Sequence, residues 1–97
     1  MLSLDPAHAH FLHVAETLHF ARSAAALHMS PSALTRSIQR LETSLGHRLF
    51  SRTKRSVRLT RAGEIFRDYA RGQASAQAQL FEALQSEDAS PTGELRI

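Results

Sequence analysis

The feature that most constrains this chain is a long proline-free segment near its C-terminal end. From Arg61 to about Ser86, apolar or small residues recur every three or four positions, which predicts one helix of roughly 26 residues and about 39 Å. The rest of the 97-residue chain is a small body that can cover only the first turns of such a helix. The simplest cover for the remainder is a second copy of the chain. We therefore expect a homodimer whose interface contains Phe66, Tyr69, Gln73, Ala76, Leu80, Phe81 and Leu84.

Two earlier helices have clear start signals, because a capping side chain is followed by proline at the first helical position. Asp5-Pro6 precedes a run in which Phe11, Val14 and Leu18 share one face. Ser30-Pro31 precedes a second run, which should end at Gly46 because glycine favours the left-handed C-cap conformation. These signals predict helices before residue 19 and from residue 31 to about 45.

A short alanine-rich helix is expected between them, from Ala21 to His28. About one residue then separates it from the helix that begins at Pro31. Two helices joined so closely are typical of a helix-turn-helix.

The helix after Pro31 has a leucine-rich side and a polar, basic side. Its expected buried face consists of Leu34, Ile38, Leu41 and Leu45. The opposite face carries serine, threonine, arginine and glutamine, and no acid occurs in the first two turns. The positive end of the helix dipole is therefore free to approach a phosphate or a base edge. Glu42, the first acid of this helix, is better explained as a structural partner of Arg48 or Arg52.

The pattern of residues 49–59 predicts a small β-hairpin with a basic tip. Apolar residues at 49–50 and at 57 and 59 flank the polar stretch 51–56, in which Lys54 and Arg55 form the tip. Thr60 should then cap the long helix.

Charge along the chain is unevenly distributed, although the net charge is only +3. Residues 1–46 carry three bases and three acids, residues 47–72 carry eight bases and two acids, and residues 73–97 carry one base and four acids. A polar helix face beside a basic hairpin favours contact with double-stranded DNA.

Each part of this surface has an expected role. Arg36 and Arg40 suit guanine or phosphate, Ser32 and Thr35 suit phosphate or base edges, and Ala33 suits a thymine methyl group. The tip Arg55 could enter a narrow minor groove. The full predicted DNA-binding set is Arg22, Ser30, Pro31, Ser32, Ala33, Thr35, Arg36, Gln39, Arg40, Arg52, Lys54 and Arg55.

Several other function classes find little support. The chain has no cysteine, and His10 with His13 lacks a third nearby ligand, so we expect no metal or other cofactor. No nucleophile elbow, glycine loop or carboxylate pair suggests an enzyme, and we expect no catalytic residue. No apolar run is long enough to span a membrane and no signal peptide is evident, so we expect a cytoplasmic protein with no membrane partner.

Residues 20–64 resemble the DNA-binding domain of LysR-type transcriptional regulators. The resemblance rests on the segment FARSAAALHMSPSALTRSIQRLETSLGHRLFSRTKRSVRLTRAGE. Its residues that follow the family pattern are Leu41-Glu42, Gly46, Leu49-Phe50, Arg52, Leu59-Thr60 and Ala62-Gly63. One difference is that members usually have Ser-Gln-Pro where this chain has Ser30-Pro31-Ser32. Proline therefore replaces a glutamine that members often use to contact a base.

The resemblance implies a mainly α fold, in which a winged helix-turn-helix of three helices and a β-hairpin wing is followed by a long dimerisation linker helix. It places the DNA-binding domain at residues 1–60, the linker at 61–87, and a hinge with the start of a missing effector-binding domain at 88–97. It also implies a dimer, or a tetramer in a full-length protein, that binds a dyad-symmetric promoter site and meets a small-molecule effector only through the missing domain.

Two alternatives remain open at this point. The chain could be a different winged-helix dimeric regulator that has no effector domain. It could instead be a protein-interaction module that uses the long helix and never contacts DNA.

Overall fold

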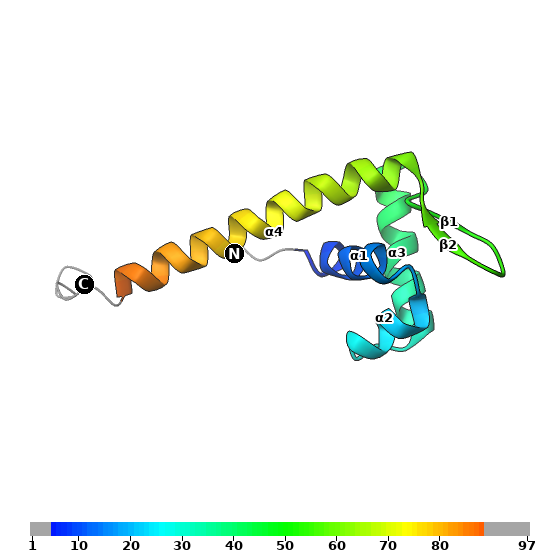
Figure 1. The fold of residues 1–97 in the computed structure, drawn as a ribbon, viewed down its shortest axis with the longest axis horizontal. Helices are drawn as coiled ribbons and strands as arrows, with labels where there is room; N and C mark the ends of the chain where they lie inside the picture. Colours follow the sequence, from blue (N-terminus) through cyan, green and yellow to red (C-terminus); the bar gives the residue numbers. More distant parts are fainter. Residues whose placement is uncertain (1–4, 89–97) are drawn as a thin grey trace.

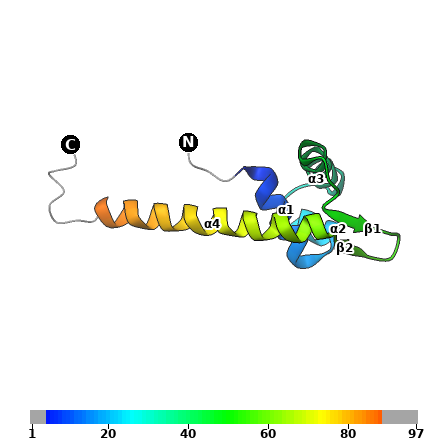
Figure 2. The ribbon, with the colours of Figure 1, turned by 90° about the horizontal axis from the view of Figure 1, so that it is seen from above.

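The computed structural model describes residues 5–88, which form four helices and one two-stranded hairpin (Figure 1). The helices are α1 (Pro6–Thr17), α2 (Phe20–Ala26), α3 (Pro31–Leu45) and α4 (Arg61–Asp88), and the strands are β1 (Phe50–Arg52) and β2 (Val57–Leu59). Helix α4 extends far beyond the body, and the hairpin projects in the opposite direction (Figures 1 and 2). The mainly α winged helix-turn-helix with a long terminal helix is confirmed.

Local chemistry explains where the helices begin and end. The Asp5 carboxylate accepts the Ala7 N–H at 2.9 Å, the Ser30 hydroxyl accepts the Ala33 N–H at 3.1 Å, and the Thr60 hydroxyl accepts the Gly63 N–H at 2.9 Å. Gly46 ends α3 with φ of 75°, a conformation that glycine adopts without strain. These caps confirm the predicted helix starts and the end of α3.

The connection between α2 and α3 is longer than expected. Helix α2 begins at Phe20 and ends at Ala26, so residues 27–30 separate it from α3. Leu27 has left the helical conformation, and His28 has φ of 58° in the left-handed region. The predicted spacing of about one residue was wrong, because the alanine-rich composition gave no sign of this early helix end.

The core lies where α1, α2, α3, the hairpin base and the first turns of α4 meet. Its fully buried large side chains are Phe11, Val14, Leu34, Ile38, Leu49 and Phe50. Leu45 was expected on the buried face of α3 but is 41% exposed, because it is the last residue of the helix and lies beyond the core. Ser37 and Glu42 are buried on α3 instead.

The antiparallel hairpin pairs Phe50 with Leu59, Ser51 with Arg58 and Arg52 with Val57. This register turns Phe50 into the core and leaves Ser51 and Arg58 exposed. The predicted hairpin is confirmed, and residues 53–56 form its turn.

Two predictions concern segments at the end of the chain. Helix α4 continues to Asp88, two residues beyond the expected end. Residues 89–97, predicted as a hinge and the start of another domain, lie outside the described residues. In the described range 5–88, no helix has the length and apolar character needed to cross a bilayer.

Gly63 lets α4 approach the start of the wing closely. A Cβ built at Gly63 would clash with the Leu49 carbonyl oxygen and lie 2.8 Å from Leu59 Cδ2. That carbonyl already accepts the Thr60 N–H at 3.0 Å, so the backbone there is not free to move away. Gly72, on the same helix, would meet no described atom within 4 Å.

We therefore predict opposite effects of two glycine-to-alanine substitutions. Gly63→Ala should lower the free energy of unfolding by about 1–3 kcal/mol through overpacking. Gly72→Ala should raise it by up to about 1 kcal/mol, because alanine favours the helical conformation more than glycine does. Urea unfolding followed by circular dichroism, at one protein concentration, measures both. A stability gain for Gly63→Ala would contradict the proposed close approach.

Candidate nucleic-acid interface

Helix α3 presents a polar N-terminal turn at the surface. Ser30, Pro31 and Ser32 are exposed, while Ala33 and Thr35 are half-buried. The Ser30 hydroxyl caps the helix and lies 3.4 Å from the Ser32 hydroxyl. Ser30 therefore has a structural role at this turn.

Farther along α3, Arg36, Gln39 and Arg40 are all exposed. These three side chains, with Thr43 and Ser44, line a shallow hollow on the helix surface. The structure thus brings together the predicted basic residues of α3 on one outward face. Two guanidinium groups and one amide on this face are the donor types that pair with guanine, adenine and phosphate.

Helix α2 carries one predicted contact residue, Arg22, whose side chain is exposed. The backbone N–H of Arg22 donates to Nδ1 of His19 at 3.0 Å, so His19 serves as the N-cap of α2. This cap was not predicted from the sequence, because histidine is not a common capping residue.

The tip of the wing is organised by Thr53. Its hydroxyl oxygen accepts the N–H groups of Arg55 and Ser56 at 3.1 Å each, and its own N–H donates to the Ser56 carbonyl at 2.9 Å. This turn leaves Lys54 and Arg55 exposed at the end of the hairpin. The two predicted tip residues therefore belong to the turn between β1 and β2, and this turn lies at the end of the hairpin away from the body (Figure 1).

Arg52 differs from the other predicted DNA-binding residues because its guanidinium is already engaged. Its Nη2 donates to Glu42 Oε1 at 3.3 Å, and its guanidinium carbon lies 4.8 Å from the Phe20 ring centroid. Only 22% of the side chain is exposed. The structure thus gives Arg52 an internal contact, and its DNA contact stays a prediction.

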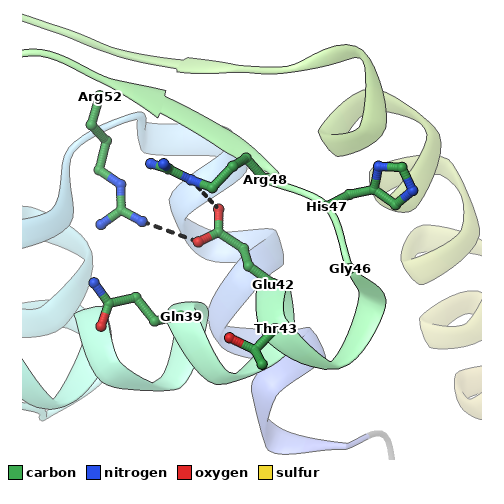
Figure 3. Close-up of a pocket in the computed structure, with 7 residues that line it drawn as sticks. All are labelled: Gln39, Glu42, Thr43, Gly46, His47, Arg48 and Arg52. Carbon is green, nitrogen blue, oxygen red and sulfur yellow. Dashed lines mark hydrogen bonds and ion pairs between the residues drawn. The ribbon is translucent and has the colours of Figure 1, made fainter.

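Figure 3 shows Glu42 between Arg52 and Arg48. The three residues help to line an open pocket of about 740 Å³. Arg48 Nε lies 3.7 Å from Glu42 Oε2, and its side chain is 66% exposed. The prediction that Glu42 pairs with Arg48 or Arg52 is confirmed, and both arginines contribute. His47 points away from Glu42 toward α4 (Figure 3).

The pairing of Glu42 has a consequence for the electrostatics of the surface. Glu42 is the only acidic residue between residues 18 and 63, and it is buried. Helices α2 and α3 and the wing therefore expose no carboxylate, while they expose Arg22, Arg36, Arg40, Lys54, Arg55 and Arg58. Such a surface attracts a polyanion without local repulsion.

The predicted dimer-interface residues of α4 fall into two groups. Tyr69, Gln73, Ala76, Phe81 and Leu84 are exposed, and Leu80 is half-buried. Phe66 is only 8% exposed, because its ring packs edge-on against Phe11 with centroids 5.0 Å apart. Phe66 therefore belongs to the core of its own protomer.

One contact and one exposed residue on this side of α4 add detail. Gln73 Oε1 lies 3.2 Å from His8 Nδ1, so its side chain also joins α4 to α1. Ile65 is 58% exposed, and it was not predicted as a dimer-interface residue from the sequence. Its position one helical turn before Tyr69 is the signal that could have identified it.

The histidines considered for metal binding have other partners. His10 Nδ1 lies 2.9 Å from the Ser37 hydroxyl, and His13 Nδ1 lies 2.9 Å from the Ser23 hydroxyl. These bonds join α1 to α3 and to α2. Among residues 5–88, no group of three or more histidines or acids has the arrangement of a metal site.

Comparison with known proteins agrees with this geometry. Residues 8–64 match the family described as "Bacterial regulatory helix-turn-helix protein, lysR family". The chain is 51% identical over 87 residues to the HTH-type transcriptional activator IlvY of Salmonella typhimurium, and 49% identical to the HTH-type transcriptional regulator IlvY of Escherichia coli. The alignment covers 90% of this chain but 30% and 29% of those relatives, so the chain spans less than a third of their length.

Solved structures of DNA complexes are also similar. The DNA-binding domain of BenM in its catB site 1 complex superposes with a TM-score of 0.83 at 29% identity, covering 88% of this chain and 94% of that one. The CbnR DNA-binding domain in its DNA complex gives a TM-score of 0.78 at 32% identity, covering 84% and 93%. By its sequence, its fold and its exposed basic face, this chain belongs to the LysR family of bacterial helix-turn-helix regulatory proteins.

Proposed function

We propose that this chain is the DNA-binding part of a dimeric transcriptional regulator that recognises a dyad-symmetric site. The observation that carries the proposal is the surface formed by α2, α3 and the wing, which exposes six bases and no carboxylate. Helix α3 would read bases in the major groove through Arg36, Gln39 and Arg40. Arg22 and the wing tip would hold phosphates on either side.

The relatives and structural neighbours support this assignment. The similar IlvY proteins are named as transcriptional regulators, and the similar BenM and CbnR domains are bound to DNA. We extend those properties to this chain, with residues 1–60 as the DNA-binding unit and 61–87 as the linker. A small-molecule effector would act through a further domain, the protein would work in the cytoplasm, and we assign it no catalytic step.

The exposed apolar side of α4 supports a dimer. Ile65, Tyr69 and Leu84 are each at least half exposed, which is unfavourable for a helix alone in water. In an antiparallel pair centred between residues 74 and 75, Ile65 would lie opposite Leu84 of the second copy, and Tyr69 would lie opposite Leu80. The small residues at 74–76 would allow the two helices to approach closely at the centre.

Charge favours the same direction of pairing. Residues 73–88 carry three acids and no base, whereas residues 61–72 carry three arginines and two acids. A parallel pair would set the acidic ends against each other, but an antiparallel pair sets each one beside the arginines of the other copy. The apolar groove lined by Leu45, Ile65 and Tyr69 would then receive the distal turns of the second α4.

Selection from a random duplex pool tests the central proposal. Several rounds of retention by the chain should enrich a motif with two-fold symmetry, with half-sites one helical turn or a multiple of it apart. Enrichment of an asymmetric single site would contradict the dimeric mode. An absence of salt-sensitive DNA binding would favour the protein-interaction alternative, and an open reading frame ending soon after Ile97 would favour a winged-helix regulator without an effector domain.

We predict that Arg36→Ala and Lys54→Ala have different effects on the selected duplex. Arg36→Ala should reduce the preference for that duplex over a scrambled one by about 1–3 kcal/mol, since a base contact is lost. Lys54→Ala should weaken both duplexes similarly and lower the salt slope by about 1, since a phosphate contact is lost. Fluorescence anisotropy titrations at several salt concentrations measure both quantities. Equal losses on both duplexes for Arg36→Ala would remove its base-reading role.

We also predict that Leu84→Glu weakens the dimer at least tenfold, because it places two charges in the apolar interface. Ser86→Glu adds the same charge to an exposed position on the other side of the same turn and should leave the dimer intact. Sedimentation equilibrium at a concentration where the parent chain is dimeric distinguishes them. An unchanged mass for Leu84→Glu would place the interface elsewhere.

A further inference from the structure

Glu42 is the one buried acid of the DNA-binding body, and its bonds all lead toward the wing. Its Oε2 accepts the N–H groups of Leu49 at 2.8 Å and Phe50 at 3.2 Å, and its Oε1 accepts from Arg52 at 3.3 Å. The carboxylate lies on α3, whereas the three donors lie at the start of β1 and at its end. A single side chain therefore joins the recognition helix to the base of the wing.

Arg52 carries this connection one step farther. Its guanidinium stacks over Phe20, the first residue of α2, and the Phe20 ring lies 5.8 Å from that of Phe50. Arg52 Nε is buried and has no hydrogen-bond partner among the described residues. The orientation of this guanidinium consequently depends on Glu42 and Phe20, and the three residues link α3, β1 and α2.

The wing needs such an external support. Each of its strands has three residues, and a two-stranded hairpin of this size is marginally stable alone in water. Lys54 and Arg55 lie at the far end of this short ribbon, so a small rotation at its base displaces both. A binding site gains affinity when its contact groups are held in place before the ligand arrives.

We propose that Glu42 is a positioning residue for DNA recognition, which sets the direction of the wing relative to α3 so that the helix and the wing tip contact one duplex together. The inference rests on the proposed contact between the wing tip and DNA. Glu42 itself would not contact DNA, because only 7% of its side chain is exposed.

The chemistry of glutamine makes Glu42→Gln a specific test. An amide has one oxygen acceptor and one NH₂ donor, whereas the carboxylate accepts with both oxygens. If the amide oxygen faces the N–H groups of Leu49 and Phe50, the NH₂ group faces the Arg52 donors. In the reverse orientation, the NH₂ group faces the N–H groups of Leu49 and Phe50. Each orientation therefore sets donors against donors. The substitution thus keeps the side-chain volume and breaks the link.

A double-mutant cycle on DNA affinity separates positioning from general destabilisation. The wing-tip pair Lys54→Ala with Arg55→Ala is introduced into the parent and into Glu42→Gln, and binding to the selected duplex is measured where circular dichroism shows all four proteins folded. The wing-tip change should lower the DNA affinity of the parent at least tenfold. In Glu42→Gln it should lower the affinity less than threefold, because in that variant the wing no longer lies on the duplex.

Glu64→Gln provides the matched control. Glu64 also pairs with an arginine at 3.3 Å, but both Glu64 and Arg61 are exposed on α4. In that background the wing-tip change should retain its full parental effect.

The outcomes distinguish this inference from the proposed function. A wing-tip effect of equal size in the parent and in Glu42→Gln would overturn the positioning role and leave DNA binding by the wing intact. No wing-tip effect in the parent would overturn both the positioning role of Glu42 and DNA binding by the wing. If Glu42→Gln does not fold, the same cycle is carried out with Arg52→Lys. Lysine keeps the charge but loses the planar group that bonds to Glu42 and stacks on Phe20. A wing-tip effect of equal size in the parent and in Arg52→Lys would overturn the inference.

Discussion

The structure depends on a group of aromatic rings that joins elements from both ends of the body. Phe11 of α1 lies 5.3 Å from Phe50 of β1 and 5.0 Å from Phe66 of α4, measured between ring centroids. Phe20 of α2 approaches Phe50 from the other side. Because neither the short α2 nor the hairpin is stable by itself, their positions are set by burial against these rings. The exposed residues that suit DNA binding thus lie on elements that this aromatic group holds in place.

Much of the fold could be predicted because the relevant signals are local. Capping at Asp5, Ser30 and Thr60 and the C-cap at Gly46 depend on neighbours within a few residues, and all four are present in the structure. The surroundings of Arg52 and Phe66 depend instead on distant contacts. For these residues, sequence spacing shows which side of a helix or strand they lie on. Tertiary packing decides which part of the molecule covers that side.

Arg52 and Phe66 illustrate that limit in the candidate site. Arg52 belongs to a basic run, and the sequence left open whether Glu42 pairs with it or with Arg48. Glu42 pairs with both, and the Phe20 ring on α2 also lies under the Arg52 guanidinium, a contact that no local pattern indicated. Phe66 follows the same spacing as Tyr69, but it lies on the side of α4 that meets α1. The exposed surface of α2, α3 and the wing carries no carboxylate, because its one acid, Glu42, is buried.

The continuous apolar side of α4 also restricts how the length of this helix can vary. Each residue added to an α-helix turns everything beyond it by about 100° and moves it by about 1.5 Å. One residue inserted near Gln73 would leave Ile65 and Tyr69 in place but rotate Leu80 and Leu84 by about 100° away from the face that these two residues share. Seven residues, close to two full turns, would restore the alignment. The length of α4 in related chains that keep this mode of assembly should therefore differ by whole heptads. Insertions of a single residue should occur after the last turn of the helix.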